Sequence, residues 1–319
     1  MSWKDDVYEL LKSNDVKDFG EALRIKRENL PQKLYRYRPV SDENIELRKK
    51  EILLGELYLS HPDELNDPFE GWSVLKSNDP AVYANKEIMM EYYESIGKTE
   101  EMQHIFENEE WFDALIEHVA KESVSADKVQ KAKEDLKKIS MSGFEDINAD
   151  MNKMTRKMVR IACFSTSPKN LPMWHHYTNG HTGICLEYDT GKIENVYNIN
   201  SLFPVYYVHK LPDMTKMVAH KRDSMLRFFD FQSIHKLEDW SYEKEWRLLY
   251  NAGSWYYSLE EVPEEYWEKG KSIIFNCPTK IILGKNISEE HEKQIRRFAE
   301  MKNIPVVKAI CTEYGLDFV

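Results

Sequence analysis

Two arginines near the start of the chain and two glutamates in its last quarter have the residue types and spacing that chemistry on a dinucleotide requires. Arg36 and Arg38 are two positions apart in an aromatic-rich segment, so in a strand their side chains share one face. Glu243 and Glu245 have the same spacing, and in an extended chain both carboxylates project together. Guanidinium groups bind phosphate oxygens through paired hydrogen bonds. Neighbouring carboxylates can divide two roles, one stabilising a cationic sugar and the other orienting an acceptor.

A run of small polar residues lies between these two pairs. Phe164-Ser165-Thr166-Ser167 precedes a proline, and a serine at a strand end can brace a neighbouring group by hydrogen bonding. Each pattern also has a plainer interpretation, which is a cross-strand ion-pair ladder for the charged residues and a strand end entering a turn for the serines. The order of a basic strand, a Ser/Thr strand and a late acid pair favours a shared site for a dinucleotide such as NAD⁺.

A second candidate site is a short segment rich in imidazole and aromatic side chains. It contains Trp174, His175, His176, Tyr177 and His181. The histidines, joined by Glu187 or Asp189, could ligate a metal, although their spacing matches no defined helical metal motif. Partly buried histidines that serve as hydrogen-bonding groups are the plainer interpretation. A third interpretation makes Trp174, His176 and Tyr177 walls of a nucleotide pocket that stack on a base or a nicotinamide ring.

The composition bounds the class of protein. The 319 residues carry a net charge of −11 and 42% hydrophobic residues, which indicates a folded chain and argues against a broad basic face for duplex nucleic acid. Four scattered cysteines exclude a zinc ribbon and favour a reduced compartment. No apolar stretch reaches the roughly 18 residues of a membrane helix, and the amino terminus has no secretory signal. We therefore expect a cytoplasmic protein. The chain also has no Walker or Gly-x-Gly-x-x-Gly loop, which disfavours kinases, ATPases and Rossmann dehydrogenases.

The elements that must position these residues alternate between strands and helices. β-branched and aromatic alternation predicts strands over 33–39, 56–60, 160–166, 183–188, 203–208, 245–250, 281–283 and 306–311. Helices are expected within 1–30, from Ser41 to Gly55, within 80–158, within 212–236 and from Ser288 to about Met301. The predicted class is α/β (α+β), with a mixed or antiparallel sheet built from both ends of the chain. We expect an N-terminal helical segment over 1–32 and one domain over 33–319 with a helical insertion at about 80–158.

Six segments resemble the hallmark blocks of a bacterial family catalogued as domain of unknown function 2971. They are Leu34–Pro39, Ser60–Glu70, Ala162–Ser165, Met173–Tyr177, His181–Asp189 and Tyr242–Arg247. The resemblance covers about residues 33–285, and the name of this family carries no assigned activity.

A second resemblance is to the ADP-ribosyltransferase superfamily. Its arginine–serine–glutamate branch shows an Arg on the first strand, a Ser-Thr-Ser strand and a Glu-x-Glu pair. This resemblance implies an ADP-ribosyltransferase-like fold in which Arg38 or Arg36 binds the phosphate or ribose of NAD⁺, Ser165 supports the nicotinamide pocket, Glu245 holds the ribose 2′-hydroxyl and Glu243 positions the acceptor. Further cofactor contacts are expected from Ser167, Trp174, His176 and Tyr177.

Three functions follow as hypotheses. The first is an enzyme that cleaves NAD and transfers ADP-ribose to a protein or nucleic-acid acceptor, without a metal. By extrapolation from the resemblance, such an enzyme would be a toxin or phage-defence effector. The helical insertion either recognises the target or an antitoxin-like partner, or it has a purely structural role in packing. The second is a non-catalytic nucleotide- or peptide-binding module. The third is a metal-dependent nuclease or hydrolase.

Overall fold

The computed structural model describes most of the chain. The described residues are 2–13, 15–75, 86, 90, 93–108, 111–119, 126–215, 217, 225–256 and 258–319. The chain forms two compact units, of which unit 1 comprises Met1–Trp72, Thr155–Leu211 and Phe229–Val319, and unit 2 comprises Ser73–Met154 and Pro212–Phe228. All the candidate site residues lie in unit 1.

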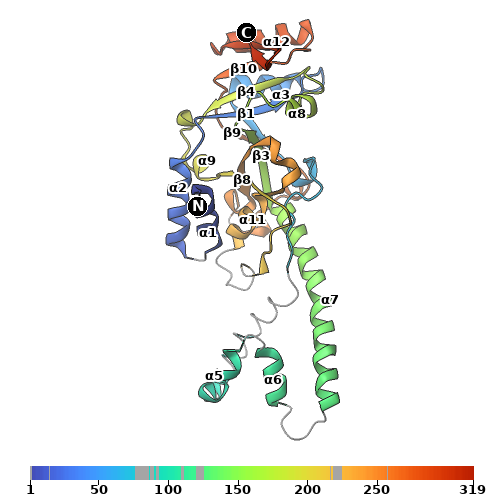
Figure 1. Cartoon of the computed structure of the whole chain (residues 1–319). Helices are drawn as coiled ribbons and strands as arrows, with labels where there is room; N and C mark the ends of the chain where they lie inside the picture. The colour runs from blue at the N-terminus through green and yellow to red at the C-terminus, as the bar shows by residue number, and fades with distance from the viewer. Residues whose placement is uncertain are drawn as a thin grey trace. The chain divides into compact units, whose positions relative to one another are not determined.

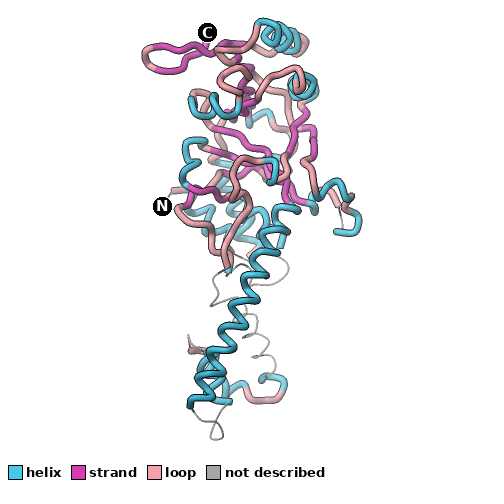
Figure 2. Tube along the Cα trace, turned by 90° about the vertical axis from the view of Figure 1, so that its right-hand side faces the viewer, coloured by secondary structure: helices cyan, strands magenta, loops and turns pink. Residues whose placement is uncertain are grey.

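A mixed eight-stranded sheet runs through unit 1 (Figures 1 and 2). Its order is β12-β11-β10-β4-β1-β3-β8-β5, and β10 and β11 are its parallel neighbours. The strands are β1 Lys33–Arg38, β3 Val159–Ser165, β4 Ile184–Asp189, β5 Leu202–Pro204, β8 Glu245–Asn251, β10 Lys280–Leu283, β11 Val306–Thr312 and β12 Gly315–Phe318. The predicted α+β class, with a mixed sheet from both ends of the chain, is confirmed.

Helices and two short strand pairs complete unit 1. The helices are α1 Trp3–Lys12, α2 Val16–Glu28, α3 Ile45–Leu54, α8 Leu171–Tyr177, α9 Val196–Asn200, α12 Glu289–Glu300 and the C-terminal part of α11 Met225–Ser233. The strand pairs are β2 Glu56–Leu59 with β9 Lys271–Ile274, and β6 Tyr206–Val208 with β7 His235–Leu237. The 3-10 helices are η1 Pro62–Glu64, η2 Thr190–Lys192, η4 Glu238–Glu243, η5 Ala252–Ser254, η6 Leu259–Glu261 and η7 Glu264–Trp267.

Alternate residues of the strands face two hydrophobic cores. The larger core contains Leu34 and Leu186 and is closed by Ile52 of α3 and Ile295 of α12. The smaller core lies on the opposite face and includes Trp174 of α8, which is fully buried. Both faces of the central strands are therefore covered, and even the charged residues Glu245 and Arg247 of β8 are buried.

Several predicted boundaries are corrected by the structure. The segment 203–208 forms two strands in different sheets, since β5 ends at Pro204 and β6 starts at Tyr206. The N-cap of α3 is Asn44 rather than Ser41, and Ser41 begins the turn before it. The final strand β12 was not predicted, because its short sequence lacks clear alternation. The caps at Ser288 and Gly55 are confirmed.

Unit 2 is helical where it is described. It contains α5 Thr99–Phe106, α6 Trp111–Val119 and most of α7 Ala126–Met158. Its small core packs Trp111 against residues of α5 and α6. The predicted insertion covers about residues 80–158, and its first part, residues 80–92, lies outside the described residues except for residues 86 and 90. None of the helices in the described ranges combines the length and hydropathy needed to cross a membrane.

Gly55 should be intolerant of a side chain. It ends α3 with φ +66°, and an added Cβ would lie 2.8 Å from the carbonyl carbon of Asn276. The left-handed conformation costs a non-glycine residue roughly 1–2 kcal/mol, and the backbone clash adds to this cost. We expect Gly55→Ala to lower the free energy of unfolding by about 2 kcal/mol or more, measured by urea denaturation. In Gly20→Ala the new Cβ meets no atom within 4 Å, so this control should stabilise α2 slightly. A Gly55→Ala protein as stable as the wild type would contradict the prediction.

Candidate active site

A pocket opens in unit 1 where β1 and β3 diverge. The two strands pair only at Tyr35 and Ser165, so the rest of β1 separates from β3. The pocket, here called the inner pocket, has a volume of about 200 Å³. Its lining includes Tyr35, Arg36, Tyr37, Arg38, Cys163, Phe164, Tyr177, Lys236, Glu243 and Glu245. Segments far apart in the sequence thus share one lining, which includes both arginines and both glutamates of the predicted set. Strand alternation and register bring the arginines to it from the opposite face of the sheet to Glu245.

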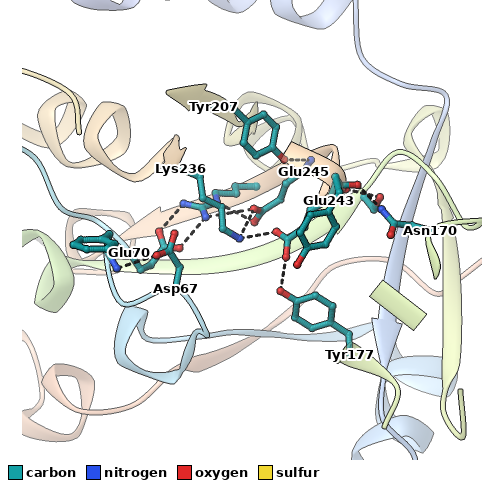
Figure 3. Close-up of polar contacts among 12 residues, drawn as sticks. Asp67, Glu70, Asn170, Tyr177, Tyr207, Lys236, Glu243 and Glu245 are labelled. Atoms are coloured by element: carbon teal, nitrogen blue, oxygen red, sulfur yellow. Dashed lines mark hydrogen bonds and ion pairs between the residues drawn. The ribbon is translucent and has the colours of Figure 1, made fainter. Parts of the chain in front are cut away.

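Glu243 and Glu245 meet at a buried lysine that was not predicted (Figure 3). Lys236 Nζ lies 2.6 Å from Oε2 of Glu243 and 3.2 Å from Oε2 of Glu245. The Tyr177 hydroxyl donates to Oε1 of Glu243 at 2.5 Å. Both glutamates are only 2% exposed, so their charges act in a medium where electrostatic interactions are strong.

The backbone brings the two carboxylates together through a turn rather than through strand alternation. Glu243 ends the 3-10 helix η4, Lys244 has φ +48°, and Glu245 is the first residue of β8. The expectation that both glutamates are extended is therefore wrong for Glu243. The left-handed Lys244 reverses the chain between them and allows Lys236 of β7 to bridge both carboxylates.

A second buried ion-pair group joins Glu245 through Arg247 to Glu70, which also lines the inner pocket. Arg247 Nε donates to Glu245 Oε1 at 2.9 Å, and its Nη1 and Nη2 donate to the two carboxylate oxygens of Glu70 at 2.6 and 2.8 Å. Arg247 is fully buried and Glu70 is 1% exposed. This bidentate contact fixes the orientation of the planar Arg247 guanidinium relative to the planar Glu70 carboxylate. Together with Glu243 and Lys236, this group forms one buried network of three carboxylates and two cations, which has a net charge of −1 when all five are ionised.

The two carboxylates of the pair have opposite protonation tendencies. Burial and the neighbouring Glu245 raise the pKa of Glu243, against the opposing effects of Lys236 and Tyr177. Burial alone would raise the pKa of Glu245, but Arg247 and Lys236 outweigh it and lower the pKa to about 2. Pairs of titratable groups with pKa values pushed apart are typical of acid–base sites.

Ser165 braces the turn rather than a carboxylate. It is fully buried, and its hydroxyl donates to the backbone carbonyl of Glu243 at 2.7 Å. Ser165 also lies opposite both Tyr35 and Glu245 in the sheet. Ser167 accepts from the Tyr37 hydroxyl through its carbonyl and is not part of the pocket lining. The Ser-Thr-Ser segment therefore positions the acid pair through the backbone.

The two arginines of β1 differ in burial and in their hydrogen-bond partners. Arg36 is 4% exposed, and its Nη2 donates to the carbonyl of Tyr58 at 2.7 Å. Arg38 forms an ion pair with Glu51 at 2.9 Å and retains 19% exposure of its side chain. Both point to the α3 face of the sheet, as strand alternation predicts.

The second predicted segment does not converge on the pocket as a unit. In α8, Trp174 faces the smaller core and donates to the carbonyl of Pro168, while His175 and His176 are exposed. Only Tyr177 and Met173 of this helix line the pocket. The helical period places neighbouring residues on different faces, which separates Trp174 from His176.

The ligand set considered for a metal is also dispersed. His181 stacks on Trp174, whereas Glu187 and Asp189 form ion pairs with Lys33 at 3.3 and 3.0 Å. Within the described ranges, no group of three or more His, Cys, Asp or Glu residues is placed to hold a metal ion.

The ion pairs of Glu245 should make the free energy of unfolding depend on pH in the acid range. A carboxyl group whose pKa is lower in the folded state stabilises the fold above its unfolded pKa, and this contribution is lost as pH falls through the folded pKa. We therefore expect the free energy of unfolding to fall between about pH 4.5 and about pH 2, with roughly 3 kcal/mol from Glu245. Urea denaturation over this range should show a weaker pH dependence for Glu245→Gln. The matched substitution at Glu264, which is exposed, should not change it. Equal pH dependence in both variants would contradict the assignment.

Comparison with known proteins supports one of the two resemblances. Residues 173–248 match the model of a family described as protein of unknown function (DUF2971), which confirms the first resemblance. The match contains the last three of its six segments. The matched segment contains Tyr177, Lys236, Glu243 and Glu245, so it carries one side of the inner pocket. No curated protein and no solved structure matches the chain. The resemblance to ADP-ribosyltransferases has no support from these comparisons.

Proposed function

Because residues 173–248 carry the DUF2971 match and that description names no activity, we propose a function from the chemistry of the inner pocket. In this proposal the protein cleaves the nicotinamide–ribose bond of NAD⁺ and transfers ADP-ribose to an acceptor. The observation that supports this proposal is the pair Glu243 and Glu245, two buried carboxylates with opposite pKa shifts in one aromatic pocket.

In this reaction, which is a substitution at the anomeric carbon C1′ of the ribose, the two carboxylates have different roles. The bond from ribose C1′ to the nicotinamide nitrogen breaks, and its electron pair leaves with nicotinamide. Glu245 remains ionised and stabilises the oxocarbenium-like sugar. A hydroxyl or other nucleophile of the acceptor then bonds to C1′ and gives its proton to Glu243, whose raised pKa suits a general base. The hydroxyl of Tyr177 and the ammonium of Lys236 hold that carboxylate in place.

The remaining lining fits the two ends of this substrate. The tyrosines Tyr35, Tyr37 and Tyr177 line the pocket and can face a cationic pyridinium ring. The net −1 charge of the Glu70, Arg247, Glu245, Lys236 and Glu243 group also favours a cation. Arg36 and Arg38 lie in the same lining and supply positive charge for the phosphates.

The direct test is nicotinamide release. Purified protein is incubated with NAD⁺, with and without added protein or single-stranded nucleic acid as acceptor, and free nicotinamide is quantified by chromatography. We expect nicotinamide release to increase with protein concentration and to persist in a metal chelator. Absence of release under every acceptor condition would contradict it.

A non-catalytic nucleotide-binding module is the second candidate. It is favoured by the ion pairs that both glutamates already form with Lys236 and Arg247. In this case NAD⁺ would raise the melting temperature by mass action without product formation. Measuring both quantities on the same sample separates the two functions.

A further inference from the structure

Two buried side chains with unpaired hydrogen-bond donors lie opposite each other where β3 meets the segment that follows β2. Ser60 and Ile161 form an antiparallel bridge through backbone hydrogen bonds of 2.7 and 2.9 Å. This register places His61 opposite Arg160, and residues at opposite positions of an antiparallel pair project their side chains from the same face. Arg160 is fully buried, and His61 is only 2% exposed.

The guanidinium of Arg160 keeps one donor without an acceptor. Its Nε donates to the carbonyl of Lys269 at 2.8 Å, and its Nη1 donates to the carbonyls of Lys157 and Val159 at 2.9 and 2.5 Å. Its central carbon lies 4.0 Å from the centre of the Tyr266 ring. All these partners are neutral groups. The Nη2 atom is buried and has no hydrogen-bond partner among the described residues.

The imidazole of His61 supplies a second donor of the same kind. Its Nδ1 accepts the backbone N–H of Asp63 at 3.1 Å at the start of η1. In a neutral imidazole one nitrogen accepts and the other carries the proton, so the proton lies on Nε2. Burial, followed by the charge of Arg160, lowers the pKa of His61, so the ring is neutral at pH 7. Nε2 is buried and finds no hydrogen-bond partner in the described part of the chain.

The carboxylates nearby are engaged with other donors. Asp63 Oδ2 lies 3.5 Å from Nδ1 of His61, and its Oδ1 accepts from Nε of Arg156 at 2.9 Å. Glu64 accepts from the Tyr58 hydroxyl at 2.8 Å and from the backbone N–H of His61 at 2.9 Å. Neither carboxylate accepts from the two unpaired donors. An unpaired buried donor destabilises a fold, so an acceptor that reaches both atoms is favoured.

The chemistry of the two donors selects a compact acceptor without hydrogens of its own. Both nitrogen atoms are buried, which favours a monatomic species. A water molecule could accept both hydrogen bonds, but its own two protons would then need acceptors. The carbonyls around Arg160 already accept from that side chain. A halide ion only accepts, and its negative charge balances the guanidinium in a charge-assisted contact.

We infer that Nη2 of Arg160 and Nε2 of His61 bind a chloride ion between β3 and the segment 60–70. The same segment carries Asp67 and Glu70 to the lining of the inner pocket. The ion would therefore anchor the start of a segment that contributes two carboxylates to that pocket. Its binding does not depend on the proposed reaction, since neither donor belongs to the pocket lining.

Chloride binding is measured on the full chain at constant ionic strength. Sodium gluconate is replaced stepwise by sodium chloride, and the melting temperature and the chlorine NMR linewidth are recorded. A ligand that binds only the folded state stabilises it by mass action. We expect the melting temperature to rise by roughly 2–4 °C for each tenfold excess of chloride over its Kd. The chlorine signal should broaden with protein and narrow again when bromide is added.

Two substitutions and a matched control test the assignment of the donors. His61→Asn keeps an oxygen near the position of Nδ1, to accept from Asp63, but removes the Nε2 donor. Arg160→Lys keeps the positive charge and removes the Nη2 donor. We expect each variant to bind chloride at least about tenfold more weakly, as for the loss of one hydrogen bond to a charged group. His235→Asn is the control, since His235 is also buried but both its ring nitrogens have hydrogen-bond partners.

Crystals grown in bromide locate the ion without any substitution. The expected result is an anomalous peak in contact with Nη2 of Arg160 and Nε2 of His61. Anomalous peaks only at other places on the protein would overturn the inference. It would also be overturned by a wild-type protein with the same melting temperature and linewidth at every chloride concentration, or by a chloride response as strong in His61→Asn as in His235→Asn.

Discussion

Glu245→Gln should reduce nicotinamide release from NAD⁺ by about 10²- to 10³-fold, as expected when one electrostatic contact to a transition state is removed. The substitution keeps the shape of the side chain but removes the negative charge that, in the proposed reaction, stabilises the developing oxocarbenium ion. The loss should appear mainly in kcat, because the charge develops only as the bond to nicotinamide breaks. Single-turnover release of nicotinamide measures it directly.

A matched control distinguishes catalysis from the general effect of losing a buried carboxylate. Glu187 is also buried and ion-paired, to Lys33, but it is not part of the pocket lining. Glu187→Gln should therefore release nicotinamide at nearly the wild-type rate, with folding of both variants verified by thermal melting. Equal turnover of Glu245→Gln and the wild type would defeat the catalytic proposal.

The strands of the site were predictable because their sequence signals are local. Alternation placed Arg36 and Arg38 on one face of β1, and a run of β-branched and aromatic residues located β3 and β8. The same alternation, continued from Glu245, would have placed Arg247 on the same face. The sequence therefore carries a local signal for this arginine.

Other members of the site carried no local signal. Glu70 and Arg247 pair across a separation of 177 residues, which no spacing rule connects. Lys236 falls in a segment expected to be helical, yet it belongs to the short strand β7, whose partner β6 was itself merged with β5 in the prediction. Trp174 was expected at the pocket because of its residue type, but tertiary packing of α8 buried it in the smaller core. Long-range pairing and helix orientation therefore determine which of these residues belong to the candidate site, and residue type alone does not predict this.

The ion pairs around Arg247 yield the largest expected change in stability. Arg247→Met would leave Glu70 with two carboxylate oxygens buried and without the bidentate partner, while Glu245 would keep Lys236. Breaking a buried pair on one side typically costs about 3–5 kcal/mol. We expect Arg247→Met to lower the free energy of unfolding by about this amount at pH 7, measured by urea denaturation.

The pH dependence and a second substitution identify the cause of this loss. Burial already raises the pKa of Glu70, and without Arg247, which opposes that rise, it rises further, so the destabilisation grows as pH increases through the unfolded pKa and shrinks toward about pH 4. Arg247→Met combined with Glu70→Gln should then recover part of the stability, because the uncompensated charge is gone. Arg160→Met is the matched control, since Arg160 is equally buried but donates to backbone carbonyls. A loss in Arg247→Met that is independent of pH and is not relieved by Glu70→Gln would show that packing rather than charge holds this part of the site, since Glu70 would then carry no unpaired charge.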